Sequence, residues 1–276
     1  MRRALLLLIA AAAGFAQEEE KPEPAADTGL TGVLSEEAFK ALHQLSVEKR
    51  PPLKGAMVDV GEMRAYLSLP KGQPPFPAVT VIHEWWGLNE HVKYWCDRLA
   101  EDGYAALGVD LYGGKVATNR DDAMAYMKGV EEAKGDALLK AAHAFLKDDP
   151  RVKAKRRGCV GWCFGGGWSL HLALAAPDLD AAVIYYGRLE TDPQRLKAIK
   201  APLLGVFGNL DTGIPMDKVN EFDDALKAAG VKYEIRRYEA PHAFANPSSA
   251  RYDQEAAEDA WKHVRAFFAK HLKAAE

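Results

Sequence analysis

The stretch GWCFGG, residues 161–166, joins two segments of different character. The residues GCVGW (158–162) form a short apolar run typical of a buried strand, and FGGGWSLHLALAA (164–176) is typical of a helix. A sharp strand-to-helix turn needs small neighbours, because the helix packs close to the strand that it follows. The stretch therefore predicts a tight turn that carries Cys163 at the start of a helix.

Strands and helices alternate on both sides of this turn. The predicted strands are AVTVIH (78–83), YAALGVDLY (104–112), AAVIYYG (181–187), PLLGVFGNL (202–210) and YEIRRYEA (233–240), and the predicted helices lie at 90–103, 121–134, 136–147, 216–230 and 253–272. Short alternating runs around Gly61 predict a hairpin before them. This order predicts an α/β protein with a mainly parallel central sheet and helices on both faces. Its functional residues should gather at the carboxyl ends of the strands.

Cys163 has two interpretations. The N-terminus of a helix favours thiolate over thiol, and the backbone N–H of Phe164 would supply half of an oxyanion hole. Alternatively, Cys163 is a small residue that only packs in a glycine-rich turn and has no reactive role. The turn alone does not decide between them.

Two further residues follow later strands in an informative order. Asp211 comes directly after PLLGVFGNL, and His242 follows YEIRRYEA. The order nucleophile, acid, histidine is that of the α/β-hydrolase fold. His242 could take and return the thiol proton while Asp211 fixes its tautomer, although a turn-capping aspartate and a loop histidine would look the same singly.

The segment HEWWGLNEH (83–91) follows the first buried strand. Its two histidines are eight residues apart with a glycine between them, whereas a zinc-binding helix needs them four apart, so we expect no metal there and no cofactor. The position after the strand instead suggests that the backbone N–H of Trp85 is a second oxyanion donor. Glu84 would then project into the site beside Cys163.

These motifs resemble the dienelactone hydrolase (carboxymethylenebutenolidase) family over about residues 55–272. The matching stretches are HEWWGL, DLYGG, GWCFGGG, YYG, GNLDTGIP and PHAFANP. The resemblance implies an α/β-hydrolase fold and a catalytic triad of Cys163, Asp211 and His242. It also implies that Glu84 holds the resting thiol and helps to deprotonate it, that Trp85 and Phe164 form the oxyanion hole, and that Tyr186 lines the pocket.

The chain departs from the family pattern at two arginine positions. The arginines that hold the substrate carboxylate in that family, after DLY and after the HxF of the histidine loop, are replaced here by Gly113-Gly114 and Asn246-Pro247. Tryptophans around the motifs, among them Trp86, indicate an aromatic substrate pocket or ordinary core packing. The natural substrate therefore stays open.

The N-terminus has the pattern of a secretory signal peptide. Arg2 and Arg3 precede an apolar run from Ala4 to Ala13 and a small-residue site at 14–16. We expect a signal peptide at 1–16, a flexible leader with a short helix at 17–50, and an α/β-hydrolase domain at 51–276. A periplasmic or secreted protein follows from this, with a retained membrane anchor as the alternative.

Composition limits the partners. The formal net charge is −3 and no long basic block is present, so we expect no nucleic-acid partner, no stable membrane insertion after signal removal, and a monomer by default. The leading hypothesis is a hydrolase that acts on a small ester or lactone through an acyl-enzyme. The alternatives are a non-catalytic binding protein on the same fold and a thiol-dependent acyl transferase or thioesterase.

Overall fold

The computed structural model describes residues 35–44 and 51–273. The predicted signal peptide lies outside these residues, as does most of the predicted leader. The strands are β1 (Ala56–Val60), β2 (Met63–Ser68), β3 (Ala78–Ile82), β4 (Ala105–Val109), β5 (Arg157–Trp162), β6 (Ala181–Tyr185), β7 (Leu203–Gly208) and β8 (Tyr233–Tyr238). The helices are α1 (Glu36–Gln44), α2 (Glu90–Glu101), α3 (Arg120–Lys128), α4 (Glu132–Asp148), α5 (Phe164–Ala175), α6 (Pro193–Leu196), α7 (Met216–Ala229) and α8 (Gln254–Leu272).

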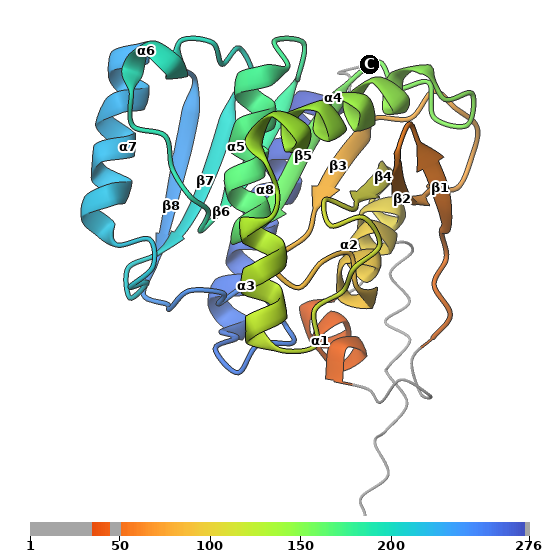
Figure 1. Ribbon diagram of the computed structural model, residues 1–276, viewed down its shortest axis with the longest axis horizontal. Coiled ribbons are helices and arrows are strands. Elements are labelled where there is room, and N and C mark those ends of the chain that lie inside the picture. Colours follow the sequence, from red (N-terminus) through yellow and green to blue (C-terminus); the bar gives the residue numbers. More distant parts are fainter. Residues whose placement is uncertain (1–34, 45–50, 274–276) are drawn as a thin grey trace, which may run out of the picture.

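The eight strands form one twisted sheet in the order β1-β2-β4-β3-β5-β6-β7-β8 (Figure 1). The β1–β2 hairpin pairs antiparallel with β4, and every pair from β4 to β8 is parallel. Strands β3 to β7 are buried along their whole length, which explains their continuous apolar sequences. The predicted fold class is confirmed.

Helices cover both faces of the sheet. Helices α4, α5 and α7 contribute to one apolar core, whereas α1, α2 and α8 contribute to the other. Figure 1 shows α4 and α5 in front of the sheet and α8 behind it. The two cores explain the apolar stripes of the amphipathic helices among these, whereas α5 has no exposed residue and is apolar nearly all round.

The predicted boundary between the third and fourth helices was wrong. The sequence suggested helices at 121–134 and 136–147, divided at Gly135, whereas α3 ends at Lys128 and α4 already begins at Glu132. Gly129 ends α3, and its N–H donates to the Ala125 carbonyl. Gly135 lies inside α4, so the segment 132–136 is one helical turn that belongs to a single helix.

The short N-terminal helix packs on the domain. Its N-cap is Ser35, whose Oγ accepts from the Ala38 N–H. Glu36 forms a buried ion pair with Arg98 at 2.8 Å and accepts from the Tyr252 hydroxyl. Phe39 is fully buried between these groups and α2.

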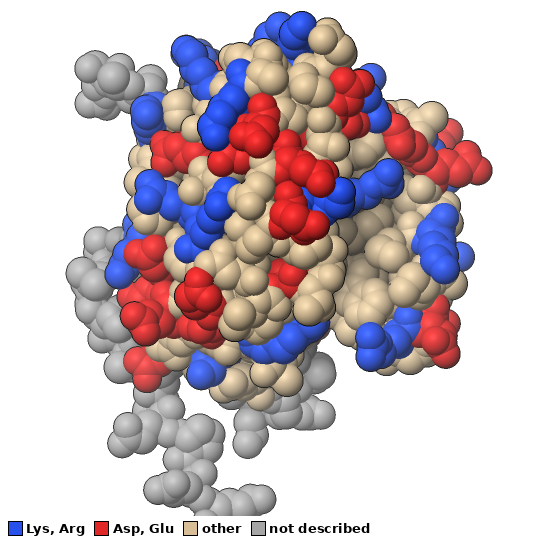
Figure 2. Space-filling model, turned by 90° about the vertical axis from the view of Figure 1, so that its left-hand side faces the viewer, with Lys and Arg blue, Asp and Glu red and all other residues tan. Residues whose placement is uncertain are grey.

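The surface mixes both charge signs. Figure 2 shows Lys and Arg interspersed with Asp and Glu over the face that it presents. Within residues 35–44 and 51–273, no helix combines the length and the apolar character that crossing a bilayer requires.

Candidate active site

Cys163 lies in a strained turn between β5 and α5. Its φ of 55° is in the left-handed region, which a residue with a Cβ rarely adopts. A Cβ on Gly161 would lie 2.0 Å from the Gly165 carbonyl oxygen, and one on Gly165 would lie 2.3 Å from the Ile82 oxygen. The glycines of GWCFGG are therefore required by the close approach of α5 to β5 and β3.

Three side chains from the ends of three strands meet at this turn. The His242 Nε2 atom lies 3.1 Å from the Cys163 sulfur, and His242 Nδ1 lies 2.6 Å from Asp211 Oδ2. Cys163 follows β5, Asp211 follows β7, and His242 lies on the loop after β8. The structure brings together the three residues that the sequence grouped by their order.

Asp211 is held as a carboxylate. It is only 3% exposed, and burial alone would oppose its ionisation. Hydrogen bonds from His242 and from the backbone N–H groups of Gly213 and Ile214 outweigh that penalty and lower its pKa. A charged acceptor therefore faces the imidazole.

The pKa of His242 is shifted in the opposite direction, upward. Burial disfavours its charged form, but the hydrogen bonds to Asp211 and Cys163 and the charges of those groups raise its pKa to about 10. At neutral pH the imidazolium is then favoured, with one N–H directed at the carboxylate and the other at the sulfur. This arrangement suits proton donation to a leaving group.

Glu84 lies near this group but does not touch the thiol. Its carboxyl accepts a hydrogen bond from the Asn246 side-chain amide, and its Oε1 is buried with no hydrogen-bond partner among the described residues. Burial raises the Glu84 pKa to about 7, against the opposing effects of His242 and Asn246. The pairing of Asn246 with Glu84 could not be predicted from local sequence patterns, because the two residues are 162 positions apart.

The loop that carries Glu84 is fixed by a neutral histidine. His83 is fully buried, and burial lowers its pKa to about 4. Its Nε2 accepts from the backbone N–H of Leu111, 3.2 Å away at the end of β4. The next residues, Glu84 and Trp85, are therefore held at the carboxyl end of the sheet.

Two backbone N–H groups at the carboxyl ends of β3 and β5 have no acceptor among the described residues. The N–H of Phe164 is at the first position of α5, and that of Trp85 follows the end of β3. They are the two donors that the sequence suggested for an oxyanion hole.

An open pocket of about 480 Å³ borders Cys163 and His242. Its other lining residues are Met127, Lys128, Val130, Glu132, Phe164, Gly167, Trp168, His171, Tyr186, Arg188, Gly213 and Ile214. Tyr186 lines this pocket as predicted, with its ring 5.0 Å from that of His242. Trp86 does not; it lies beside Glu84 and Asn246 in a separate small pocket. The sequence predicted no role for Arg188, and it placed His171 two helical turns beyond Cys163, about 12 Å along the axis and too far for the triad. Both residues nevertheless line the pocket.

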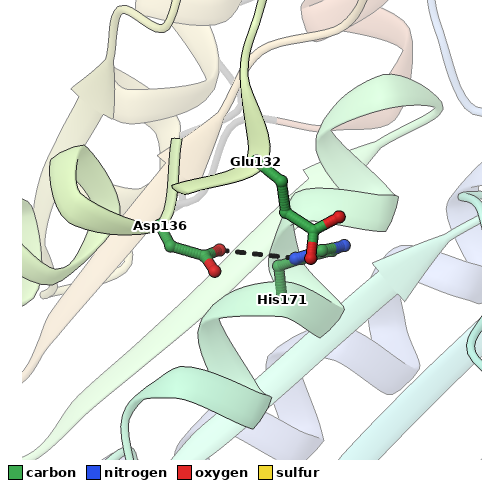
Figure 3. Close-up of side chains that lie close together, drawn as sticks. All are labelled: Glu132, Asp136 and His171. Carbon is green, nitrogen blue, oxygen red and sulfur yellow. Dashed lines mark ion pairs between the residues drawn. The ribbon is translucent and has the colours of Figure 1, made fainter. Parts of the chain in front are cut away.

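One group of potential metal ligands lies within the described residues. Glu132 and Asp136 of α4 and His171 of α5 place one donor atom each within 4.8 Å of one another (Figure 3). Glu132 and His171 also line the pocket that Cys163 borders.

Comparisons with known proteins agree on one family. The profile of the dienelactone hydrolase family matches residues 63–272. Protein usf of Aquifex pyrophilus is 36% identical over 220 residues, which cover 76% of this chain and 94% of that protein. A protein of Methylorubrum extorquens named "Putative carboxymethylenebutenolidase" is 34% identical over 226 residues, covering 76% of this chain and 78% of its own.

Comparison with solved structures indicates the same family. A structure from Klebsiella pneumoniae named "Putative Dienelactone Hydrolase" is 31% identical and superposes with a TM-score of 0.74, covering 79% of this chain and 98% of its own. The acylaminoacyl peptidase of Pyrococcus horikoshii, 17% identical with a TM-score of 0.65, shares the fold alone. The chain belongs to the dienelactone hydrolase family and is an α/β-hydrolase of the lactone or ester type.

Proposed function

We propose that the protein hydrolyses small carboxylic esters or lactones with a Cys163–His242–Asp211 triad and through an acyl-enzyme. The observation that carries this proposal is the continuous line of contacts from sulfur to imidazole to carboxylate, 3.1 Å and 2.6 Å long. A buried structural cysteine would need neither partner. Cys96 and Cys159, by contrast, are fully buried, and burial raises the pKa of both thiols.

The first half of the reaction forms a thioester. The Cys163 sulfur attacks the acyl carbon, and the carbonyl π electrons move to oxygen, where the N–H groups of Phe164 and Trp85 stabilise the charge. The intermediate collapses by breaking the acyl C–O bond, and the leaving oxygen takes the proton from His242 Nε2. In a lactone that oxygen stays tethered to the acyl group.

The second half releases the acid. Neutral His242 takes a proton from water, and the resulting hydroxide adds to the thioester carbon. Collapse of this intermediate breaks the C–S bond, and the sulfur leaves as thiolate beside the imidazolium. Asp211 keeps the imidazole in the required tautomer throughout.

Glu84 is the fourth group of the proposed machinery. In the proposed resting enzyme its carboxyl would leave Asn246 and reach the Cys163 thiol, help to take its proton when substrate arrives, and return that proton to the thiolate after the acid is released. The pKa of about 7 supports this role, since such a carboxyl exchanges a proton near neutral pH. Tyr186 and the apolar wall of the pocket would bind the acyl group.

Hydrolysis of p-nitrophenyl acetate and a panel of lactones tests the proposal. We expect activity that iodoacetamide abolishes and that falls by roughly 10³-fold or more in Cys163→Ala and Cys163→Ser. Mass spectrometry should detect an acyl group on the Cys163 peptide with a slow substrate. Undiminished activity in Cys163→Ala would contradict the nucleophile, and inactivity on every ester with tight binding of one would favour a binding protein.

We also propose that the protein acts outside the cytoplasm. The apolar run after Arg2 and Arg3 supports an export signal. Fractionation of cells that express the full chain should place a form cleaved near residue 16 in the periplasm or the medium. Recovery of the uncleaved chain in the cytoplasm would contradict this.

A further inference from the structure

The outer part of the pocket carries one imidazole and two carboxylates on neighbouring helices. Glu132 and Asp136 are one turn apart on α4, and His171 faces them from α5. Figure 3 shows both carboxylates turned toward the His171 ring. The presence of the imidazole distinguishes this group from an ordinary acidic surface cluster.

The two helices are held close by a tryptophan against a glycine. A Cβ on Gly135 would lie 2.1 Å from the Trp168 ring, so only glycine allows this packing. The same Trp168 ring packs on the His171 ring with a centroid distance of 4.9 Å. The position of His171 opposite Asp136 is therefore fixed by the packing of α4 on α5.

The contact between Asp136 and His171 is incomplete as it stands. Their Oδ1 and Nδ1 atoms lie 3.3 Å apart, yet Asp136 Oδ1 is buried and accepts no hydrogen bond within the described residues. A buried carboxylate oxygen without a donor is costly, because it has lost its water. A cation bound between the oxygen and the ring nitrogen would satisfy both lone pairs.

The distances suit a single ion. Two ligand atoms that each lie about 2.1 Å from a metal are roughly 3 to 3.5 Å apart in tetrahedral or octahedral geometry. The Asp136–His171 distance already falls in this range. Glu132, whose donor atom lies within 4.8 Å of the other two, is at the first turn of α4 and exposed, so its carboxylate would have to turn inward to bind the same ion.

We propose that Glu132, Asp136 and His171 bind a divalent transition-metal ion, Zn²⁺ above all, with water completing its coordination. Imidazole with carboxylates is a ligand set that Zn²⁺ accepts, and three protein ligands leave a position open toward the pocket. Arg195, 3.8 Å from Glu132, competes for that carboxylate and limits the affinity.

The ion would not contact the bond that the enzyme breaks. His171 follows Cys163 by eight residues along α5, about 12 Å at the rise of an α-helix. The ion therefore lies where the distal part of a bound substrate would be. Its binding does not depend on the proposed triad.

Zn²⁺ binding to the full chain tests the site, in a Cys163→Ser background because the Cys163 thiol and His242 could themselves bind zinc. We expect isothermal titration to give one ion per chain at this site, and His171→Ala to remove it. Glu132→Gln should weaken it by at least about tenfold. His263→Ala is the matched control, since His263 and Asp259 also form a surface ion pair but have no third ligand within residues 35–44 and 51–273.

Thermal melting supplies the second measurement. Zn²⁺ should raise the melting temperature of the Cys163→Ser parent and of His263→Ala, but not that of His171→Ala. Metal-free melting shows whether the variants fold, and Glu132→Gln, which alters an exposed side chain, keeps the test valid if His171→Ala is unstable. The proposal would be overturned if the parent and Glu132→Gln bound zinc equally well, or if His263→Ala lost as much zinc binding as His171→Ala.

Discussion

The carboxylate of Asp211 is one of the groups that favour the charged form of His242 next to it. Both of its oxygens are used, Oδ1 by the backbone N–H groups of Gly213 and Ile214 and Oδ2 by His242. A neutral amide in its place would keep the shape of the side chain but not its charge. The pKa of His242 should then fall, because one of the groups that raises it is gone.

Asp211→Asn should therefore fold normally and lose activity. We expect kcat/KM for p-nitrophenyl acetate to fall by about 10² to 10⁴-fold, since the tautomer and the charge of His242 are no longer fixed. Stopped assays on the purified variant measure this. Asp217→Asn, on the exposed first turn of α7, serves as the control, and equal activities of the two variants would contradict the role of Asp211.

At the scale of elements, the approach of α5 to β3 depends on a missing side chain. A Cβ on Gly165 would meet the backbone oxygens of Ile82 and His83, which cannot move aside as a side chain can. The same contact places Cys163 above the end of β5. The absence of a side chain at Gly165 is therefore required both for the packing of α5 on the sheet and for the position of Cys163.

Gly165→Ala should be strongly destabilised. We expect a loss of about 2 to 4 kcal/mol in the free energy of unfolding, measured by urea denaturation. Gly129→Ala is a suitable comparison, because Gly129 has an ordinary helical φ and its nearest atom would be 3.3 Å away. If both variants unfold at the same urea concentration, α5 can move away from β3 without cost, and the proposed requirement for glycine at position 165 is wrong.

The ion pair that joins α1 to α2 has a similar test. Glu36→Ala removes the carboxylate that accompanies the buried Arg98 guanidinium, which costs about 3 to 5 kcal/mol in comparable cases. Chemical denaturation gives the value. Glu37→Ala, exposed on the same helix, should change stability by about 0.5 kcal/mol at most, and a similar effect of both changes would mean that α1 does not stabilise the domain.

The sequence predicted the elements that depend on local patterns. Cys163, Asp211 and His242 could be grouped because each follows an apolar strand, and parallel strands end at one edge. The placement of Trp86 away from the pocket and the Glu84–Asn246 contact could not be predicted, since they depend on how loops pack. The predicted helix boundary at Gly135 placed Glu132 and Asp136 on different helices. Gly135 resembles a helix break in the sequence, but in the structure it makes room for the Trp168 ring inside a continuous helix.

At the scale of the whole molecule, one buried carboxyl links stability to pH. The pKa of Glu84 rises from 4.5 to about 7 on folding, mainly through burial. Between these values the folded protein keeps a proton that the unfolded chain has released. The stability associated with this group is thus fully present below pH 4.5 and is lost as the pH rises through about 7.

Glu84→Gln should remove this dependence. We expect the wild type to lose stability relative to the variant as the pH rises from about 4.5 to about 7, measured by urea midpoints across that range. Glu62→Gln, an exposed change in the β1–β2 turn, should run parallel to the wild type. Parallel curves for Glu84→Gln as well would show that folding does not raise the pKa of Glu84.

The different burial of the three cysteines allows the natively folded fraction of a preparation to be measured. Cys96 and Cys159 are sealed in the two cores, and Cys163 alone is partly open to solvent. A colorimetric thiol reagent should therefore titrate one equivalent per native chain and three after denaturation. The ratio of the two readings is a direct gauge of the fraction of a preparation that is correctly folded, independent of any substrate.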